Sequence, residues 1–309
     1  MAAFNHTSAS PEIFLLMGIP GLEKAHTWIA ISLCSIYIAT ILGNCTILLI
    51  IRMEPSLHQP MYYFLCMLAV TDLGLSASTL PTMLSIFLFQ SREVSVNACF
   101  AQLYFIHAFS FMESAVLLIM AFDRCVAIHK PLRYTSILTN ATVSRMGLAF
   151  MVRSVLMVMP TPILLRRLQY CLPNVLSHSF CLHQDVMKLA CSERMINSIY
   201  GLFAVLITMG LDAMLIILSY IMIFKTVLSI ATKKERLKAL NTCVSHICAV
   251  LIFYTPMIGI SVIHRFEKHA SPLVLIIMAN VYVLVPPVMN PIVYSMKTKQ
   301  IRRRILQRL

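Results

Sequence analysis

The chain has 309 residues, of which 59% are hydrophobic and only 12% are charged, and its mean hydropathy is +0.82. A soluble domain of this length carries about twice that share of charged residues, so the composition excludes a globule whose whole surface faces water. The formal net charge of +13 could indicate a nucleic-acid partner, but the placement of the basic residues in short loops argues against one.

Seven apolar stretches are each long enough to cross about 30 Å of hydrocarbon, which takes about 20 helical residues. They cover residues 28–51, 61–88, 99–128, 143–165, 196–228, 240–263 and 272–294. The links between them are short. We therefore predict an all-α membrane protein, a seven-transmembrane-helix bundle that forms one domain over residues 1–309. Residues 1–26 are its N-terminal segment, and residues 296–309 form a short amphipathic helix on the inner leaflet.

The basic residues indicate the orientation of these spans. Lys and Arg gather after the third span, after the fifth span and in the tail, so these segments are expected to be cytoplasmic and the N-terminus extracellular. The net charge is then mostly a topology signal, together with attraction to anionic lipid. Asn5 begins an Asn-His-Thr sequon and is a predicted glycosylation site on the outer face.

Four of the ten cysteines lie on the predicted outer side. They are Cys99 at the outer start of the third span and Cys171, Cys181 and Cys191 in the long outer loop. Because this side faces an oxidising compartment, we expect two disulfides, and three pairings are open. The cysteines show no CxxC pair and no metal-ligand spacing, so no metal site is predicted.

Five motifs recur in order along nearly the whole chain. They are LHQPMYYFL (57–65), MAFDRCVAIHKPLRY (120–134), SHSFC (177–181), KALNTCVSH (238–246) and PPVMNPIVYS (286–295). Together they resemble the odorant receptors, a branch of the rhodopsin-like G-protein-coupled receptors. IPGLE (19–23) and HRF (264–266) are most similar to the fish-like class I branch. Two positions depart from the pattern: Cys125 stands where a Tyr is usual, and His129 where a Cys is usual.

This resemblance implies a plasma-membrane receptor that binds a small volatile ligand and activates a stimulatory heterotrimeric G protein, which raises cyclic AMP. It also implies a switch at the inner face, formed by Asp123, Arg124, Asn290, Pro291 and Tyr294. By itself, the adjacent Asp123 and Arg124 could equally be an interfacial ion pair whose arginine reaches toward water.

Asp72 and Glu113 are the two carboxylates deepest in the predicted spans. Charged groups at this depth are costly and mark functional sites. Two such carboxylates cannot both be ionised without a partner, so they either hold a cation or share a proton. We expect a sodium ion, as the resemblance implies, and no other cofactor.

The candidate ligand site lies toward the outer side. Tyr254, Ile258, Ser261 and Arg265 follow a helical stripe, and His107 and Gln184 are expected to face them. A guanidinium beside a hydroxyl and an imidazole favours an anionic head group such as a carboxylate. Class I receptors, which the chain resembles, are associated with short organic acids. Arg265 could instead reach toward water, and His107 could be a core histidine.

Other functions fit the sequence less well. A secondary transporter of small organic anions could use intramembrane carboxylates, but such folds usually show internal repeats, which are not visible here. No metal or nucleophile motif indicates an enzyme, and no pore loop or ring of like charges indicates a channel.

Overall fold

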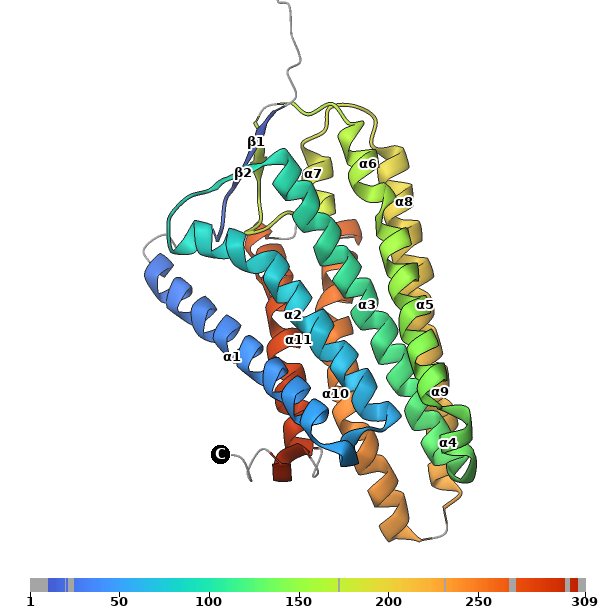
Figure 1. Ribbon diagram of the computed structural model, residues 1–309. Coiled ribbons are helices and arrows are strands. Elements are labelled where there is room, and N and C mark those ends of the chain that lie inside the picture. Colours follow the sequence, from blue (N-terminus) through green and yellow to red (C-terminus); the bar gives the residue numbers. More distant parts are fainter. Residues whose placement is uncertain are drawn as a thin grey trace, which may run out of the picture.

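The computed structural model describes residues 11–19, 21, 25–171, 173–230, 232–266, 271–297 and 301–304, without the side chains of residues 238, 242, 262, 264–266, 272, 296 and 297. Within these residues, seven helical segments are long and apolar enough to cross a membrane. They run side by side as a bundle (Figure 1), which confirms the predicted seven-helix fold.

Five spans are single helices; the first, second, third and sixth carry the labels α1 (His26–Met53), α2 (Pro60–Phe87), α3 (Val96–His129) and α10 (Lys233–Phe266). The last, α11 (Pro272–Lys297), is also unbroken. The fourth span joins α5 (Asn140–Val158) to α6 (Pro160–Arg166). The fifth joins α8 (Met195–Val205) to α9 (Leu211–Leu228) through a π-helical turn, η4 (Leu206–Gly210).

The helices extend beyond the apolar stretches that predicted them. The clearest case is α10, which begins seven residues before residue 240 and includes a polar first turn. Polar residues can continue a helix into the aqueous layer, so hydropathy marks the hydrocarbon crossing and not the helix ends. Local caps mark two starts: the Ser95 hydroxyl accepts from the Ala98 N–H at 3.3 Å, and the Thr139 hydroxyl from the Thr142 N–H at 3.2 Å.

We call the end of the bundle that the sequence predicts to be cytoplasmic the inner end, and the opposite end the outer end. Four shorter helices connect the spans: η2 (Pro55–Leu57), η3 (Pro131–Arg133) and α4 (Tyr134–Ile137) at the inner end, and α7 (His183–Lys188) at the outer end. Residues 301–304 of the predicted amphipathic tail are helical. Ile301 is fully buried there, and Arg304 pairs with Glu54 at 3.3 Å. The tail thus contacts the inner end of α1.

Helix α3 lies at the centre of the bundle. Within its most apolar stretch, 72% of the residues are buried. Helices α1 and α11 pack closely against each other at Gly43, where a Cβ atom would lie only 3.0 Å from the Pro291 ring. The Asn44 amide donates to the Pro287 carbonyl at 2.9 Å. This carbonyl needs a donor from outside α11 because the prolines of that helix have no N–H to bond it.

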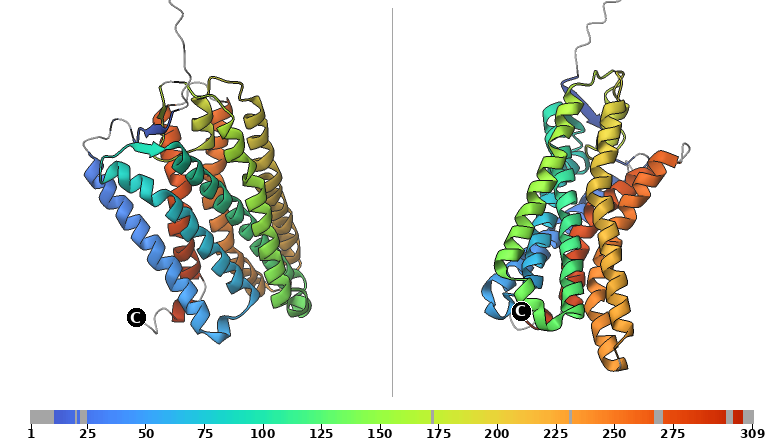
Figure 2. Two further views of the ribbon diagram at one scale, coloured as in Figure 1. Left: turned by 45° about the horizontal axis from the view of Figure 1, so that its top comes forward. Right: turned by 90° about the vertical axis from the view of Figure 1, so that its right-hand side faces the viewer.

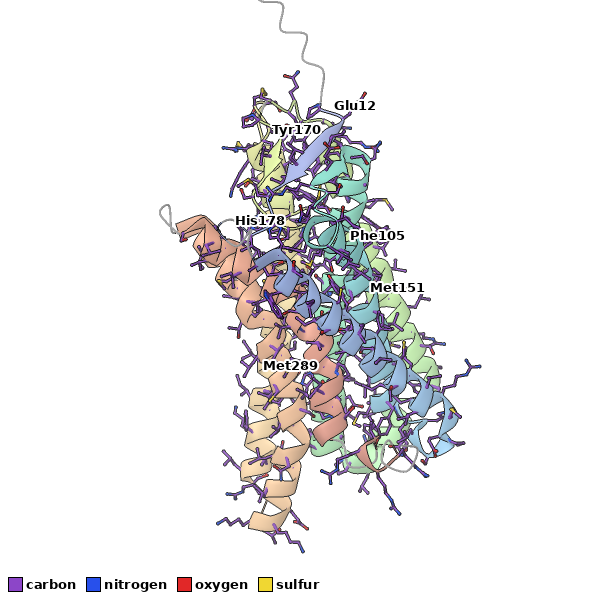
Figure 3. All side chains as sticks on the ribbon, turned by 90° about the vertical axis from the view of Figure 1, so that its left-hand side faces the viewer. Glu12, Phe105, Met151, Tyr170, His178 and Met289 are labelled. Carbon is purple, nitrogen blue, oxygen red and sulfur yellow. A yellow bond between two sulfur atoms is a disulfide. The ribbon has the colours of Figure 1, made fainter. Side chains whose placement is uncertain are left out.

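A small three-stranded sheet covers the outer end of the bundle. Strand β1 (Ile13–Leu16) pairs antiparallel with β2 (Glu93–Ser95) and parallel with β3 (Val175–Leu176). Phe14 is fully buried, and its ring lies 5.5 Å from that of Tyr170. Figure 3 shows Tyr170 at this end of the bundle. Residues 13–16, before the first span, are therefore part of the outer cap, which hydropathy did not predict.

The outer cysteines form Cys99–Cys181 and Cys171–Cys191, so two disulfides are present as predicted and the pairing is one of the three left open. Cys99–Cys181 ties the long outer loop to the start of α3. Cys171–Cys191 closes a 20-residue separation within that loop.

Candidate functional site

A cavity of about 630 Å³ lies in the outer half of the bundle. Three predicted ligand residues reach it from different elements: His107 from α3, Gln184 from α7 and Ser261 from α10. Most of the remaining lining is apolar, and α8 contributes the largest part of it. A largely apolar cavity with a few placed polar groups is the usual form of a small-molecule site.

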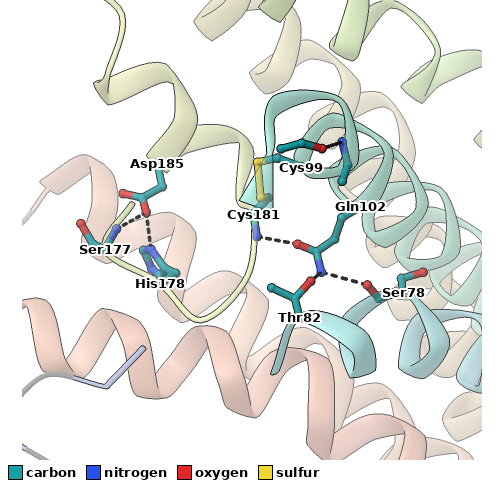
Figure 4. The surroundings of a disulfide bond; sticks show 10 residues. Ser78, Thr82, Cys99, Gln102, Ser177, His178, Cys181 and Asp185 are labelled. Atoms are coloured by element: carbon teal, nitrogen blue, oxygen red, sulfur yellow. Dashed lines mark hydrogen bonds and ion pairs between the residues drawn. A yellow bond between two sulfur atoms is a disulfide. The ribbon is translucent and has the colours of Figure 1, made fainter. Parts of the chain in front are cut away.

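The outer loop reaches the cavity because Gln102 and the first disulfide hold it down (Figure 4). The Cys181 N–H donates to Gln102 Oε1 at 2.9 Å. Gln102 Nε2 in turn donates to the Ser78 carbonyl at 2.9 Å and to the Thr82 hydroxyl at 2.7 Å. These bonds connect the loop to both α2 and α3, so the residues after Cys181 are fixed over the bundle.

His183 follows directly and lies edge-on to His107, with the ring centroids 6.4 Å apart. Burial, and then the neighbouring His107, lower the pKa of His183 to about 3. The imidazole is therefore neutral at physiological pH and can both donate and accept a hydrogen bond at the cavity wall.

Asp185 is nearby but bonded elsewhere. Its Oδ2 accepts from the Ser177 N–H at 2.7 Å and from His178 Nδ1 at 3.0 Å (Figure 4). Burial raises the pKa of Asp185, but the hydrogen bond and charge of His178 and the charge of Lys188 outweigh it, so the pKa lies below its usual value. The described lining includes no carboxylate, whereas Lys188 and Arg194 stand at the outer rim. The charge at the rim is positive.

Two predicted ligand residues are not brought to this cavity. Ile258 is 52% exposed on the outside of the bundle, and Tyr254 is buried in a separate polar network. Of the predicted stripe on α10, Ser261 lines the cavity, whereas Ile258 and Tyr254 do not. The side chain of Arg265 lies outside the described residues.

An ion pair between a partly exposed arginine and a fully buried aspartate joins the fourth and fifth spans beneath the cavity. Arg153 donates to both carboxylate oxygens of Asp212, at 2.8 and 2.6 Å. The Ser114 hydroxyl donates to Asp212 at 2.9 Å and lies 2.8 Å from the Tyr254 hydroxyl. This network connects α3, α5, α9 and α10.

Sequence reasoning assigned no role to Arg153, Asp212 or His246. Each of them is an ionisable residue inside an apolar span, which is itself a sign of a functional or structural role. Spacing along the chain, however, does not reveal their partners on other helices. The partners of His246 also lie on other helices: its Nε2 lies 2.9 Å from the Leu117 carbonyl of α3, and its Nδ1 lies 2.7 Å from the Tyr220 hydroxyl of α9.

Asp72 and Glu113 meet at the centre of the bundle, as predicted. One amide, Nδ2 of Asn290, lies 3.1 and 3.2 Å from the two Asp72 oxygens and 3.2 Å from Glu113 Oε1. The other Glu113 oxygen, Oε2, is buried without a hydrogen-bond partner among the described residues. Three acceptor oxygens therefore compete for the two hydrogens of one amide group.

At the inner end, Arg124 Nε lies 3.6 Å from Asp123 Oδ2. Asp123 also accepts from the Tyr134 hydroxyl of α4 at 2.6 Å. Burial, and then Asp123, raise the pKa of Tyr134, so the phenol keeps the proton that it donates. Arg124 is buried, and Tyr294 is buried close to α3, with its hydroxyl 3.9 Å from Met120 Sδ.

Comparisons with known proteins agree with this architecture. A family model described as "Olfactory receptor" matches residues 33–309. The chain is 62% identical to "Olfactory receptor 51A4" of Homo sapiens over 309 residues, which is 100% of this chain and 98% of that protein. It is 61% identical to "Olfactory receptor 51A7" of Homo sapiens with the same coverage. "Olfactory receptor 51E2" of Homo sapiens is 53% identical over 99% of this chain and 95% of its own length.

Proposed function

The chain belongs to the olfactory receptor family, whose members are odorant-sensing G-protein-coupled receptors of the plasma membrane and not enzymes, and on this premise we propose that its odorants carry a carboxylate or a similarly strong acceptor. The observation that supports this most directly is the charge of the outer cavity. Its described lining has two cations at the rim, Lys188 and Arg194, and no carboxylate. An anionic head group gains from both without meeting a like charge.

The polar groups deeper in the cavity supply the remaining contacts. Ser261 and Gln184 can donate to a head-group oxygen, and His107 lies beside the neutral His183. Phe111, Val158 and Leu202 line the apolar part, which accommodates a hydrocarbon chain. Arg265, from the same helix as Ser261, is the predicted third cation.

We further propose that the N-terminus is extracellular and that Arg124 is the cytoplasmic switch. In the resting receptor, Asp123 and Tyr134 hold the end of α3. When α10 moves outward, Arg124 is released from Asp123 and faces the cavity that receives the G protein. A stimulatory G protein then raises cyclic AMP. Asn290, Pro291 and Tyr294 complete the switch on α11.

Asp72 and Glu113 are proposed to hold a sodium ion. The unpartnered Oε2 of Glu113 supports this, because a cation would supply the charge and the ligand that this oxygen lacks. A shared proton between the two carboxyl groups is the alternative.

A ligand panel tests the proposed function. Cells expressing the receptor are exposed to aliphatic acids, alcohols and aldehydes of matched chain length, and cyclic AMP is measured. We expect the acids to be the strongest agonists and Arg265→Ala to abolish their effect without reducing surface expression, because the guanidinium no longer pairs with the carboxylate.

Arg166→Ala is the matched control. Arg166 is an exposed arginine at the outer end of the bundle, bonded to Asn97 at 2.8 Å and outside this cavity. It should leave acid responses unchanged. Equal acid responses in the wild type and Arg265→Ala would remove Arg265 from the site. Acid-dependent anion flux without any cyclic AMP response would replace the receptor assignment with a transporter.

A further inference from the structure

One stripe of side chains on the fifth span both lines the outer cavity and lies on the exposed surface. It consists of Met195, Ser198 and Leu202 of α8 and Leu206 of η4. Their spacing of three, four and four residues places them on one helix face. Met195 is 60% exposed and Leu206 is 56% exposed. A side chain that lines a cavity and is also exposed marks an opening in the cavity wall.

The opening does not face the fourth span, because that side of α8 is packed. The Tyr200 hydroxyl donates to the Met157 carbonyl of α5 at 2.7 Å, and Asn197 and Ala204 are buried. The cavity continues instead to Ser261 of α10. In the right-hand view of Figure 2, the outer end of α10 leans away from α8. The opening is therefore a slot between the outer halves of α8 and α10.

The outer loop blocks the direct path from the aqueous side. Phe180 and Val186 are fully buried on either side of Leu182, which is itself buried and lines the cavity. The Cys99–Cys181 disulfide and the sheet containing β1 fix this cap in place. A ligand that came from directly above would have to displace a covalently anchored loop.

The two ends of the slot differ in chemistry. Lys188 and Arg194 lie at its outer rim, next to Met195. Leu206 lies about 16 Å further along the span, at 1.5 Å per residue, and so well within the hydrocarbon layer. This polarity matches an amphiphile in the outer leaflet, with its polar head at the interface and its chain among the lipid tails.

We propose that odorants enter and leave sideways from the outer leaflet, through the slot between α8 and α10, with the head group passing Lys188 and Arg194 and the chain passing Leu202 and Leu206. This inference rests on the proposed odorant-binding role of the cavity. It adds that the membrane, and not the aqueous phase, delivers the ligand.

A gate residue has a kinetic signature that a contact residue lacks. Narrowing a passage slows entry and exit equally and leaves their ratio unchanged, whereas a lost contact changes the ratio. We therefore compare Ser198→Trp, which places an indole in the slot, with Ile199→Trp. Ile199 is the next residue on α8, is exposed and does not line the cavity.

The measurement is the association and dissociation rate constants of the most active panel compound, acid or otherwise, on receptor in lipid nanodiscs. Ser198→Trp should lower both constants about tenfold with their ratio nearly constant, and Ile199→Trp should match the wild type. If Ser198→Trp does not reach the membrane, Leu202→Trp replaces it as the variant that narrows the slot.

Unchanged rate constants in the slot variants, or the same slowing in Ile199→Trp, would overturn the lateral route. The proposed ligand class is contradicted by a different result from the one that contradicts the lateral route. If only alcohols or aldehydes activate the wild type, the carboxylate assignment is wrong, and the same kinetic comparison is made with the active compound.

Discussion

Among single residues, Glu113 is an ionisable side chain that is almost completely buried. It is a carboxylate near the midpoint of the most buried helix, with one oxygen hydrogen-bonded and the other unpartnered among the described side chains. An ionised carboxylate left in this state would be very costly. Either a bound cation or a proton must therefore accompany the receptor's resting state, and Asp72, which contacts the same Asn290 amide, is the neighbouring carboxyl group.

Salt replacement distinguishes these two occupants. If sodium is bound, replacing sodium chloride with choline chloride at equal ionic strength should shift the affinity of the agonist several-fold. Glu113→Gln should remove this dependence, because the amide supplies no charge to the ion. Agonist competition binding in the two salts makes the measurement.

Glu93→Gln is the control, since Glu93 is an exposed carboxylate of β2 and should leave the salt dependence intact. If the wild type shows no difference between sodium and choline, a shared proton holds the pair and the sodium site is wrong.

At the scale of elements, strand β1 changes the role of the N-terminal segment. Its alternation is clear: Phe14 and Leu16 are buried beneath the sheet, whereas Ile13 is 42% exposed. The strand also bridges β2 and β3, which are separated by some 80 residues of chain. The cap over the cavity therefore depends on a few residues that precede the first span.

Phe14→Ala should destabilise this cap. Removing a fully buried phenylalanine costs about 3–5 kcal/mol, and the loss falls on the sheet because Phe14 packs against Tyr170 and Phe100. We expect faster protease cleavage in the outer loop and lower surface expression, measured by limited proteolysis of intact cells and by flow cytometry.

Ile13→Ala provides a control on the same strand. Its side chain points to the exposed face and should leave cleavage nearly unchanged. Equal sensitivity of the two variants would mean that β1 does not support the cap.

For the whole molecule, the sequence predicted most of what depends on hydrophobicity and little of what depends on tertiary contacts. Span length alone located all seven helices, because the bilayer requires a nearly constant number of apolar residues. The pair Asp72 and Glu113 was found because charge inside a span is rare. Their shared partner Asn290 was assigned only to the switch, since nothing in local spacing indicates a contact across 218 positions.

The residues of the ligand cavity show the same difference between what hydrophobicity predicts and what tertiary contacts decide. His107, Gln184 and Ser261 line the cavity, whereas Ile258, from the same predicted stripe as Ser261, is exposed on the outside of the bundle, which only the packing of the helices reveals. Arg153 and Asp212 were overlooked as a pair. They lie on separate spans 59 residues apart, and only packing brings their charges together.

Orientation is a property of the whole chain, and two sequons test it: Asn-His-Thr at Asn5 and Asn-Ala-Thr at Asn140. Asn5 precedes the first span and lies outside the described residues. Asn140 begins α5 at the inner end of the bundle, beside α4 (Figure 1). The basic loops predict that this end is cytoplasmic, where the glycosylation machinery would not act on the chain. Glycosidase treatment should therefore shift the mass of the wild type and of Asn140→Gln but not that of Asn5→Gln. A shift that disappears in Asn140→Gln and persists in Asn5→Gln would invert the bundle, and with it the assignment of the cavity to the outer face.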